Sequence, residues 1–169
     1  MAIGDIRKGR IKKLQAVQRA GFSSYPEITK RTHKIGEVLD NFSKLDRAQK
    51  NITVVGRIRT LRSHGGATFC DIEDSTGKIQ IFLRKDGLGE KGYKFFLDNF
   101  DIGDFIEVRG SLMKTKRGEK TVSVFDFKIL AKSLLPLPEK WHGLQDIEER
   151  FRKRYLDLIF NPEVRKRFE

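Results

Sequence analysis

The feature that most restricts the fold of this chain is an alternation of apolar and polar residues that begins at residue 51. It recurs in five segments, over residues 51–62, 67–74, 78–84, 104–115 and 120–132. Successive side chains of a β-strand point to opposite faces, so a period of two predicts strands that each have one buried face. Glycine-containing turns at 74–77 and 116–119 separate neighbouring strands.

Helical spacing surrounds and interrupts these strands. It predicts a helix over residues 5–20, which Asp5 can cap and Gly21 can end, and shorter helices over 35–47 and 89–99. Three consecutive strands, a helix and a two-stranded hairpin follow the order of a five-stranded OB-fold barrel. An unrelated small β-barrel or an open sheet is the alternative that the pattern leaves open.

Beyond the barrel the sequence predicts an extended linker and further helices. Two prolines, Pro136 and Pro138, disfavour a helix after Leu134. Residues 146–158 return to helical spacing, and Pro162 is suited to the first turn of another helix.

The sequence therefore predicts a mainly β protein with flanking helices, in three parts. These are an N-terminal helical extension at 1–50, the OB-fold barrel at 51–132, and a linker with C-terminal helices at 133–169. Because the helical pattern still continues at Phe168, we expect the sequence to be a piece of a longer protein.

The chain is strongly basic, and the excess charge is concentrated near its N-terminus. Its 35 Lys and Arg residues outnumber 23 Asp and Glu residues, which gives a formal net charge of +12. Residues 1–50 alone hold 12 basic and 5 acidic side chains. Clustered basic residues displace counterions from nucleic acid, so Lys8, Lys12 and Lys13 are candidates for RNA backbone contacts. A helix face that is merely solvated is the simpler alternative.

The sequence argues against a membrane or secreted protein. It contains no apolar run of about eighteen residues, and the stripe of Ile11, Leu14 and Val17 is too narrow for an interfacial helix. The N-terminus lacks the apolar region of a secretory signal, and Cys70 is the only cysteine, so no internal disulfide can form. We expect a cytoplasmic protein with an anionic partner and no membrane partner.

The alternation also assigns side chains to the two faces of the second and third strands. Cys70 and its same-face neighbours point inward, whereas Phe69 shares the other face with acidic residues. On the third strand Gln80 and Phe82 point outward. Aromatic rings stack on unpaired bases for about 1–3 kcal/mol each, and a Gln amide both donates and accepts hydrogen bonds. We therefore expect an exposed base-binding surface, the alternative being that a loop or hairpin covers Phe69.

No catalytic or metal-binding pattern is present in the sequence. Asp71, Glu73 and Asp74 cluster beside a turn, which explains them without chemistry. The sequence has no phosphate-binding glycine loop, no GxSxG and no HExxH. Its three histidines do not show metal-ligand spacing. We expect no catalytic residue, no metal site and no cofactor in this chain.

Several segments resemble class II lysyl-tRNA synthetases. They are ITVVGRIRTLRSHGGATFCDIEDSTGKIQIF, LLPLPEKWHGLQDIEERFRKRYLDLI, the triplet Arg31-Thr32-His33 and the pair Asn161-Pro162. The resemblance implies an OB-fold that reads the anticodon of tRNA-Lys, in an aminoacyl-tRNA ligase that makes lysyl-adenylate from lysine, ATP and Mg²⁺. It also implies that the catalytic motifs of the full-length homodimer lie outside this sequence. We expect the chain alone to be inactive and monomeric.

The resemblance further implies roles for single residues. Phe69 matches the phenylalanine that stacks on the central anticodon uridine, Gln80 matches the glutamine that reads this base, and Arg62 matches an arginine beside them. Asp126 stands where many relatives have Glu, so its carboxylate reaches about one methylene less far. Trp141-His142-Gly143 we interpret as linker packing.

Two functions of other classes remain as alternatives. A non-specific single-strand binder of the cold-shock kind needs several exposed aromatic residues along the strands, and the linker sequence argues against it. If the chain is a protein-interaction module, we expect its binding not to weaken steeply with salt. Binding that relies on contacts to phosphates does weaken steeply as the salt concentration rises.

Overall fold

The computed structural model describes residues 3–137 and 146–168, so the second half of the proline linker and Trp141-His142-Gly143 lie outside the described residues. The chain forms two compact units, residues 1–135 and residues 136–169. The first holds the barrel with four helices, and the second holds three short helices. No helix in the described ranges is long and apolar enough to cross a membrane.

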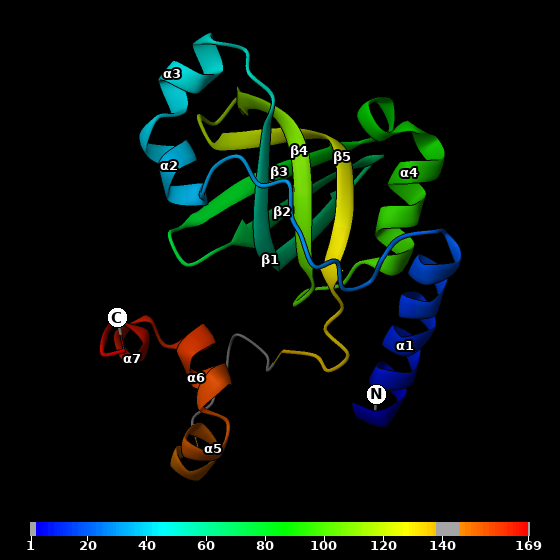
Figure 1. The fold of residues 1–169 in the computed structure, drawn as a ribbon, viewed down its shortest axis with the longest axis vertical. Coiled ribbons are helices and arrows are strands. Elements are labelled where there is room, and N and C mark those ends of the chain that lie inside the picture. Colours follow the sequence, from blue (N-terminus) through cyan, green and yellow to red (C-terminus); the bar gives the residue numbers. More distant parts are fainter. Residues whose placement is uncertain (1–2, 138–145, 169) are drawn as a thin grey trace. The chain divides into compact units, whose positions relative to one another are not determined.

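Five strands close into a barrel in the first unit (Figure 1). They are β1 (Ile52–His64), β2 (Ala67–Glu73), β3 (Lys78–Arg84), β4 (Phe105–Lys114) and β5 (Lys120–Ala131). The order around the barrel is β1-β2-β3-β5-β4, and every pairing is antiparallel except that of β3 with β5. This arrangement confirms the OB-fold prediction, and the closure excludes the open sheet.

The period of two fills the barrel interior with apolar side chains. On β2 and β3, alternate residues are buried and their neighbours are partly exposed. Cys70 is fully buried, as expected, and burial raises the pKa of its thiol far above the ordinary value. Burial keeps this thiol neutral, so it packs as a small apolar group.

Helix α4 (Lys85–Asn99) packs against the barrel and contributes Phe96 to an aromatic cluster. The Phe96 ring stacks on Phe100 at 4.7 Å and meets Phe127 of β5 edge-on at 5.2 Å. The helix begins four residues earlier than the predicted 89–99 segment. Gly89 explains the difference, because its φ of 71° interrupts the helix and leaves a short first segment that helical spacing does not reveal.

The N-terminal helices pack onto the same barrel. They are α1 (Ile3–Arg19), α2 (Ile35–Asp40) and α3 (Phe42–Arg47). In Figure 1, α2 and α3 lie at one side of the barrel, whereas α1 lies beside α4 at the other. The single helix predicted over 35–47 is two helices, because Asn41 leaves the helical backbone conformation with φ −101° and ψ 15°.

A buried charge cluster joins α1 to the barrel. The Lys132 ammonium group, fully buried at the end of β5, donates to Asp101 at 2.6 Å and to Asp104 at 2.7 Å. Asp101 also accepts from Lys13 of α1 at 2.6 Å. We call Lys13, Asp101, Asp104 and Lys132 the charge cluster.

The two carboxylates of the charge cluster respond differently to the same lysine. Burial raises the pKa of Asp104 above its ordinary value, and Lys132 offsets only part of this increase. Burial also acts on Asp101, but hydrogen bonds from Lys13 and Lys132 reverse the effect and leave its pKa lowered. The second lysine and the smaller burial of Asp101 therefore both favour its charged form.

The second unit contains α5 (Ile147–Arg152), α6 (Arg154–Phe160) and α7 (Pro162–Lys166). The single helix predicted over 146–158 is broken at Lys153, whose φ of −117° and ψ of 48° are not helical. The buried Asp157 accepts hydrogen bonds from Arg150 of α5 at 3.0 Å and from Arg154 at 2.6 Å, and so holds the two helices together. The helix predicted to open at Asn161-Pro162 is α7.

Candidate nucleic-acid interface

The strand register of β1, β2 and β3 brings three of the four predicted anticodon-reading residues onto one surface. Arg62 of β1 pairs with Phe69 of β2, and Phe69 pairs with Phe82 of β3. One step along the same face of β2, Asp71 pairs with Gln80. We call these five residues the outer site, because the alternate residues of β2 and β3 point into the core.

Phe69 and Phe82 stack on each other rather than standing free. Their ring centroids are 4.5 Å apart, and the ring planes meet at 20°. Both side chains are partly buried, whereas the alternation predicted that they are exposed. Each ring covers part of the other, and neither belongs to the buried core. The Arg84 guanidinium lies 5.6 Å from the Phe82 centroid and brings a positive charge to the pair.

Asp71 belongs to the outer site although sequence reasoning explained it by the neighbouring turn. Its carboxylate accepts a hydrogen bond from the Thr60 hydroxyl at 2.8 Å and an ion-pair contact from Arg62 at 3.4 Å. Asp71 thereby orients an arginine that is largely exposed. The signal that could have identified it was available, since the alternation places Asp71 on the same face as Phe69.

The other two clustered carboxylates have structural partners. Glu73 forms an ion pair with Arg59 at 3.0 Å. Asp74 accepts hydrogen bonds within its turn and from the Ile35 backbone at 2.9 Å, and so ties the β2–β3 turn to α2. Partial burial raises the pKa of Asp74, but these backbone and hydroxyl donors outweigh it and lower the pKa. Both carboxylates therefore contribute to the structure of the barrel and of its β2–β3 turn.

Gln80 is oriented by a neighbouring strand. The Thr121 hydroxyl of β5 lies 3.0 Å from Gln80 Oε1 and 3.1 Å from the carbonyl oxygen of Glu119, and its single proton can be donated to only one of them at a time. The amide oxygen of Gln80 keeps a lone pair, and the two N–H groups of the amide remain available as donors. An amide held in this way complements a carbonyl oxygen on a base edge.

Asp126 lies apart from the other predicted residues. It sits on β5 opposite Arg109 of β4, beyond the last pairing of β5 with β3. Its side chain is exposed and has no hydrogen bond or ion pair with any residue in the described ranges. The structure thus groups Arg62, Phe69 and Gln80, and leaves the Asp126 carboxylate unpaired farther along the barrel surface.

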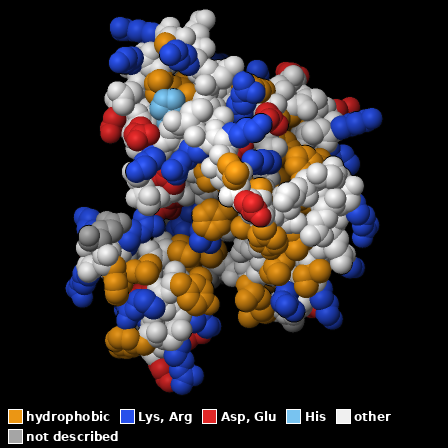
Figure 2. Space-filling model, viewed as in Figure 1, with side chains coloured by type: hydrophobic (Ala, Val, Ile, Leu, Met, Phe, Trp, Pro, Cys, Tyr) orange, Lys and Arg blue, Asp and Glu red, His pale blue; other side chains and the backbone are white. Residues whose placement is uncertain are grey.

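The three candidate lysines of α1 differ in their surroundings. Lys8 and Lys12 are exposed, whereas Lys13 is only partly exposed and is bound to Asp101 in the charge cluster. Lys13 therefore has a structural role in addition to the predicted backbone contact. Lys and Arg side chains, drawn in blue, outnumber acidic ones on the face shown in Figure 2. The face shown is thus suited to an anionic partner.

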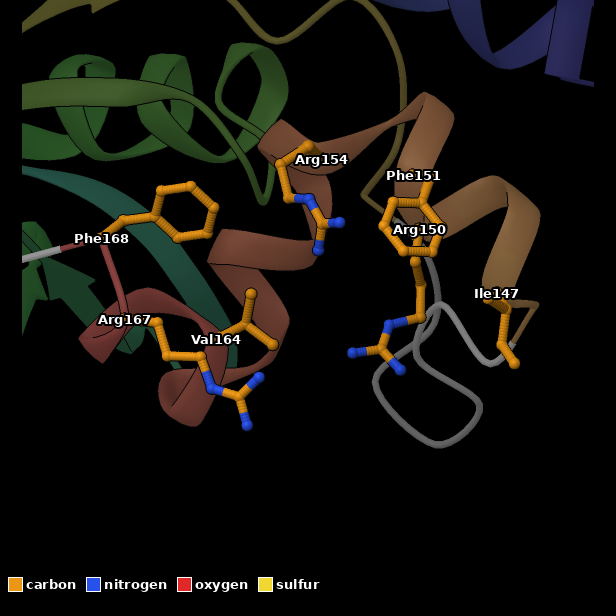
Figure 3. A pocket seen from close by; sticks show the side chains of 7 residues that line it. All are labelled: Ile147, Arg150, Phe151, Arg154, Val164, Arg167 and Phe168. Atoms are coloured by element: carbon orange, nitrogen blue, oxygen red, sulfur yellow. The ribbon is translucent and has the colours of Figure 1, made fainter.

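A hollow in the second unit is lined by apolar and arginine side chains (Figure 3). The lining residues are Ile147, Arg150, Phe151, Arg154, Val164, Arg167 and Phe168. This lining contains no carboxylate, and the described ranges contain no group of three His, Cys, Asp or Glu residues placed to hold a metal ion. Mg²⁺ prefers oxygen ligands, so the lining of this hollow does not offer the ligands of a magnesium–nucleotide site.

The amino-acid sequence of the chain is similar to those of known proteins. Residues 52–130 match the tRNA anti-codon family, an OB-fold nucleic acid binding domain. The chain is 49% identical to a lysine–tRNA ligase of Carboxydothermus hydrogenoformans over 166 residues, which are 98% of this chain and 33% of the relative. It is 47% identical to that of Roseiflexus sp. over 169 residues, 99% of this chain and 35% of the relative. The identity to the Aquifex aeolicus enzyme is 56% over 117 residues, 69% of this chain and 20% of the relative. The chain thus spans about a third of the length of the first two relatives.

Proposed function

The chain carries a tRNA anti-codon OB-fold domain at residues 52–130 and is similar over nearly its whole length to the N-terminal region of lysine–tRNA ligases, and on this premise we propose that it binds the anticodon stem-loop of tRNA-Lys. The observation that supports this proposal most directly is the outer site. A stacked aromatic pair, an oriented amide and an oriented arginine share one barrel face. These groups suit the stacking, the edge recognition and the charge of an unpaired nucleotide.

Each residue of the outer site has a separate task in the proposed complex. Phe69, supported from one side by Phe82, stacks on the central base of the anticodon. Gln80 donates an amide N–H to a carbonyl oxygen of this base, and Arg62 contacts the loop while Asp71 holds its guanidinium in place. The unpaired Asp126 carboxylate accepts an N–H from a further base. Lys8 and Lys12 of α1 contact the RNA backbone.

The proposal extends to the longer protein that the relatives exemplify. We infer that such a protein attaches lysine to tRNA-Lys in the cytoplasm, with ATP and Mg²⁺, as a homodimer. The residues described above contribute tRNA recognition to that activity. They bind and orient the anticodon, and no step of the chemistry is assigned to them.

Substitutions of Phe69 and Gln80 test the proposal because the loss of each side chain should affect binding to the two stem-loops differently. Phe69→Ala should weaken binding by about 1–3 kcal/mol for stem-loops with either UUU or UCU anticodons, because every base presents a π-face. Gln80→Ala should cost about 0.5–1.5 kcal/mol on UUU and little on UCU. Uracil offers an acceptor oxygen where cytosine offers an amino donor. Titration of both stem-loops with the wild-type chain and each variant measures these effects.

Two controls make the result specific. Phe151→Ala removes a side chain that is 69% exposed in the second unit and should leave binding unchanged. Gln80→Glu keeps the shape of the amide but replaces its donors by a carboxylate oxygen, so it should weaken UUU binding at least as much as Gln80→Ala. If Gln80→Ala weakens both loops equally, Gln80 does not read the base. If Phe69→Ala unfolds the domain in a thermal melt, the ring is part of the core.

The salt dependence of binding tests the α1 lysines. Each phosphate contact adds about 0.7–0.9 to the slope of log affinity against log salt concentration. The double substitution Lys8→Ala, Lys12→Ala should therefore flatten this slope by about 1.4–1.8, with a similar loss for every RNA. Lys94→Ala on α4, whose side chain is 75% exposed and pairs with Asp98, serves as the matched control. An unchanged slope in the double variant removes α1 from the RNA-binding surface.

A further inference from the structure

Phe125 is an exposed aromatic residue at an irregularity of β5. Arg109 of β4 pairs with Asp126, but the next residue, Gly110, pairs with Val124. Phe125 is therefore an extra residue that has no partner on β4, which defines a β-bulge. Its side chain is 39% exposed, although it belongs to a barrel strand with several buried apolar residues.

The bulge places two neighbouring side chains on the same side of the strand. In a regular strand, consecutive side chains point to opposite faces. Here Phe125 and Asp126 are both exposed, while Val124 and Phe127 on either side are buried in the core. The bulge thus sets an aromatic ring beside a carboxylate that has no partner among the described residues.

A cation completes this arrangement. The Arg109 guanidinium lies 5.5 Å from the centroid of the Phe125 ring. Arg109 is exposed, and no carboxylate in the described ranges forms an ion pair with it. The surface therefore offers a π-face, a free positive charge and a hydrogen-bond acceptor at one place. These are the groups that bind a base, a phosphate and a base N–H, respectively.

The position of Phe125 relates it to the outer site. In the parallel pairing of β3 and β5, Ser123 lies beside Phe82, which stacks on Phe69. Phe125 is two residues farther along β5, a distance of about 7 Å along the strand. Phe69 lies on β2, two strands away from β5, which adds about 10 Å across the barrel. Phe125 is therefore about 12 Å from Phe69, and a loop that places one base on Phe69 can place a nearby nucleotide on Phe125.

We propose that Phe125 is a second base-stacking residue, which holds a nucleotide next to the one bound at Phe69. Arg109 supports the ring and neutralises the adjacent phosphate, and Asp126 accepts an N–H from the base stacked on Phe125. This inference rests on the proposed function, because it assumes that the RNA loop lies across the outer site. It adds a contact to that site that depends on a bulge rather than on regular alternation.

The test uses UUU stem-loops that carry 2-aminopurine at one anticodon position at a time, because this base loses fluorescence when it stacks. Phe125→Ala should weaken binding by about 5- to 150-fold and restore the fluorescence at one position. Phe69→Ala should restore it at a different position. Phe125→Leu keeps an apolar side chain without a π-face and should behave like Phe125→Ala, whereas Phe125→Tyr should bind like wild type. Thermal melts of each variant show that the barrel is folded.

The outcomes separate the inference from the proposed function. If Phe69→Ala weakens binding and Phe125→Ala does not, the inference that Phe125 stacks on a second base is wrong. The proposed binding of the anticodon at the outer site is then unaffected. If both variants restore fluorescence at the same position, Phe125 acts only through the outer site and the inference is overturned. If Phe125→Leu binds as well as wild type, apolar packing rather than stacking is its role. If the wild-type chain does not bind the stem-loop, the proposed function itself is wrong.

Discussion

Replacing Lys132 by Met should lower the free energy of unfolding by about 3–5 kcal/mol, because it leaves the buried Asp104 carboxylate without its cation. Lys132 is fully buried and bridges Asp101 and Asp104 at 2.6 and 2.7 Å. Asp104 is also fully buried and pairs with no other lysine in the part of the chain that the structure describes, so it carries most of the cost. Denaturant titration of the wild-type chain and the variant measures the difference.

Two further variants show whether the loss comes from the unpaired charge. Lys94→Met removes an exposed lysine that pairs with Asp98 at 3.2 Å, and it should change stability by no more than about 0.5 kcal/mol. Adding Asp104→Asn to Lys132→Met removes the isolated charge and should recover part of the stability. A loss below about 1 kcal/mol for Lys132→Met would mean that water reaches the charge cluster, contrary to its burial.

Replacing Gly110 by Ala should destabilise the barrel by about 3 kcal/mol or more, at the upper end of the range for overpacking. A Cβ atom at Gly110 would overlap the backbone oxygen of Ser123 and lie 2.7 Å from the Val122 side chain. Both obstacles belong to β5, and one of them is main chain, so the strands themselves have to separate. Thermal and denaturant unfolding of the variant measure the effect.

Gly9 provides the matched control for this substitution. It lies within α1, and a Cβ atom there would meet no other atom within 4 Å. Gly9→Ala should therefore stabilise the chain by about 0.5–1 kcal/mol, since alanine loses less backbone entropy in a helix. Destabilisation by both substitutions would point to a general effect of losing glycine rather than to the contact between β4 and β5.

The strands could be predicted because alternation is a local property of the sequence. The five segments with a period of two correspond to the five strands of the barrel, since each segment buries one face whatever its neighbours are. The residues at which the helices begin and end were harder to predict. Helical spacing continues through Asn41 and Lys153, where the backbone leaves the helix, and it gives no sign of the segment before Gly89.

In the candidate site too, the features that depend on the local sequence could be predicted, whereas contacts between strands could not. Alternation assigned Phe69 and Gln80 to the outer face, but it could not indicate that Phe82 covers part of Phe69 or that Thr121 orients Gln80. These contacts depend on strand register, and in the case of Thr121 on a parallel pairing between segments about forty residues apart. The position of Phe125 depends on a β-bulge, which the sequence around it does not indicate.

The attachment of α1 to the barrel affects the order in which the chain can fold. Arg10 donates hydrogen bonds to the carbonyl oxygens of Ile102, Ser133 and Leu135, which lie 92, 123 and 125 residues later in the sequence. Ribosomes extend a chain by about 5–20 residues per second, so α1 is made about 6–25 s before its last partner. Most of the stability of a helix in a protein comes from its tertiary packing rather than from the helix alone. Helix α1, although it is made first, can therefore dock fully only after the segment following β5 has provided the carbonyl groups that hold it.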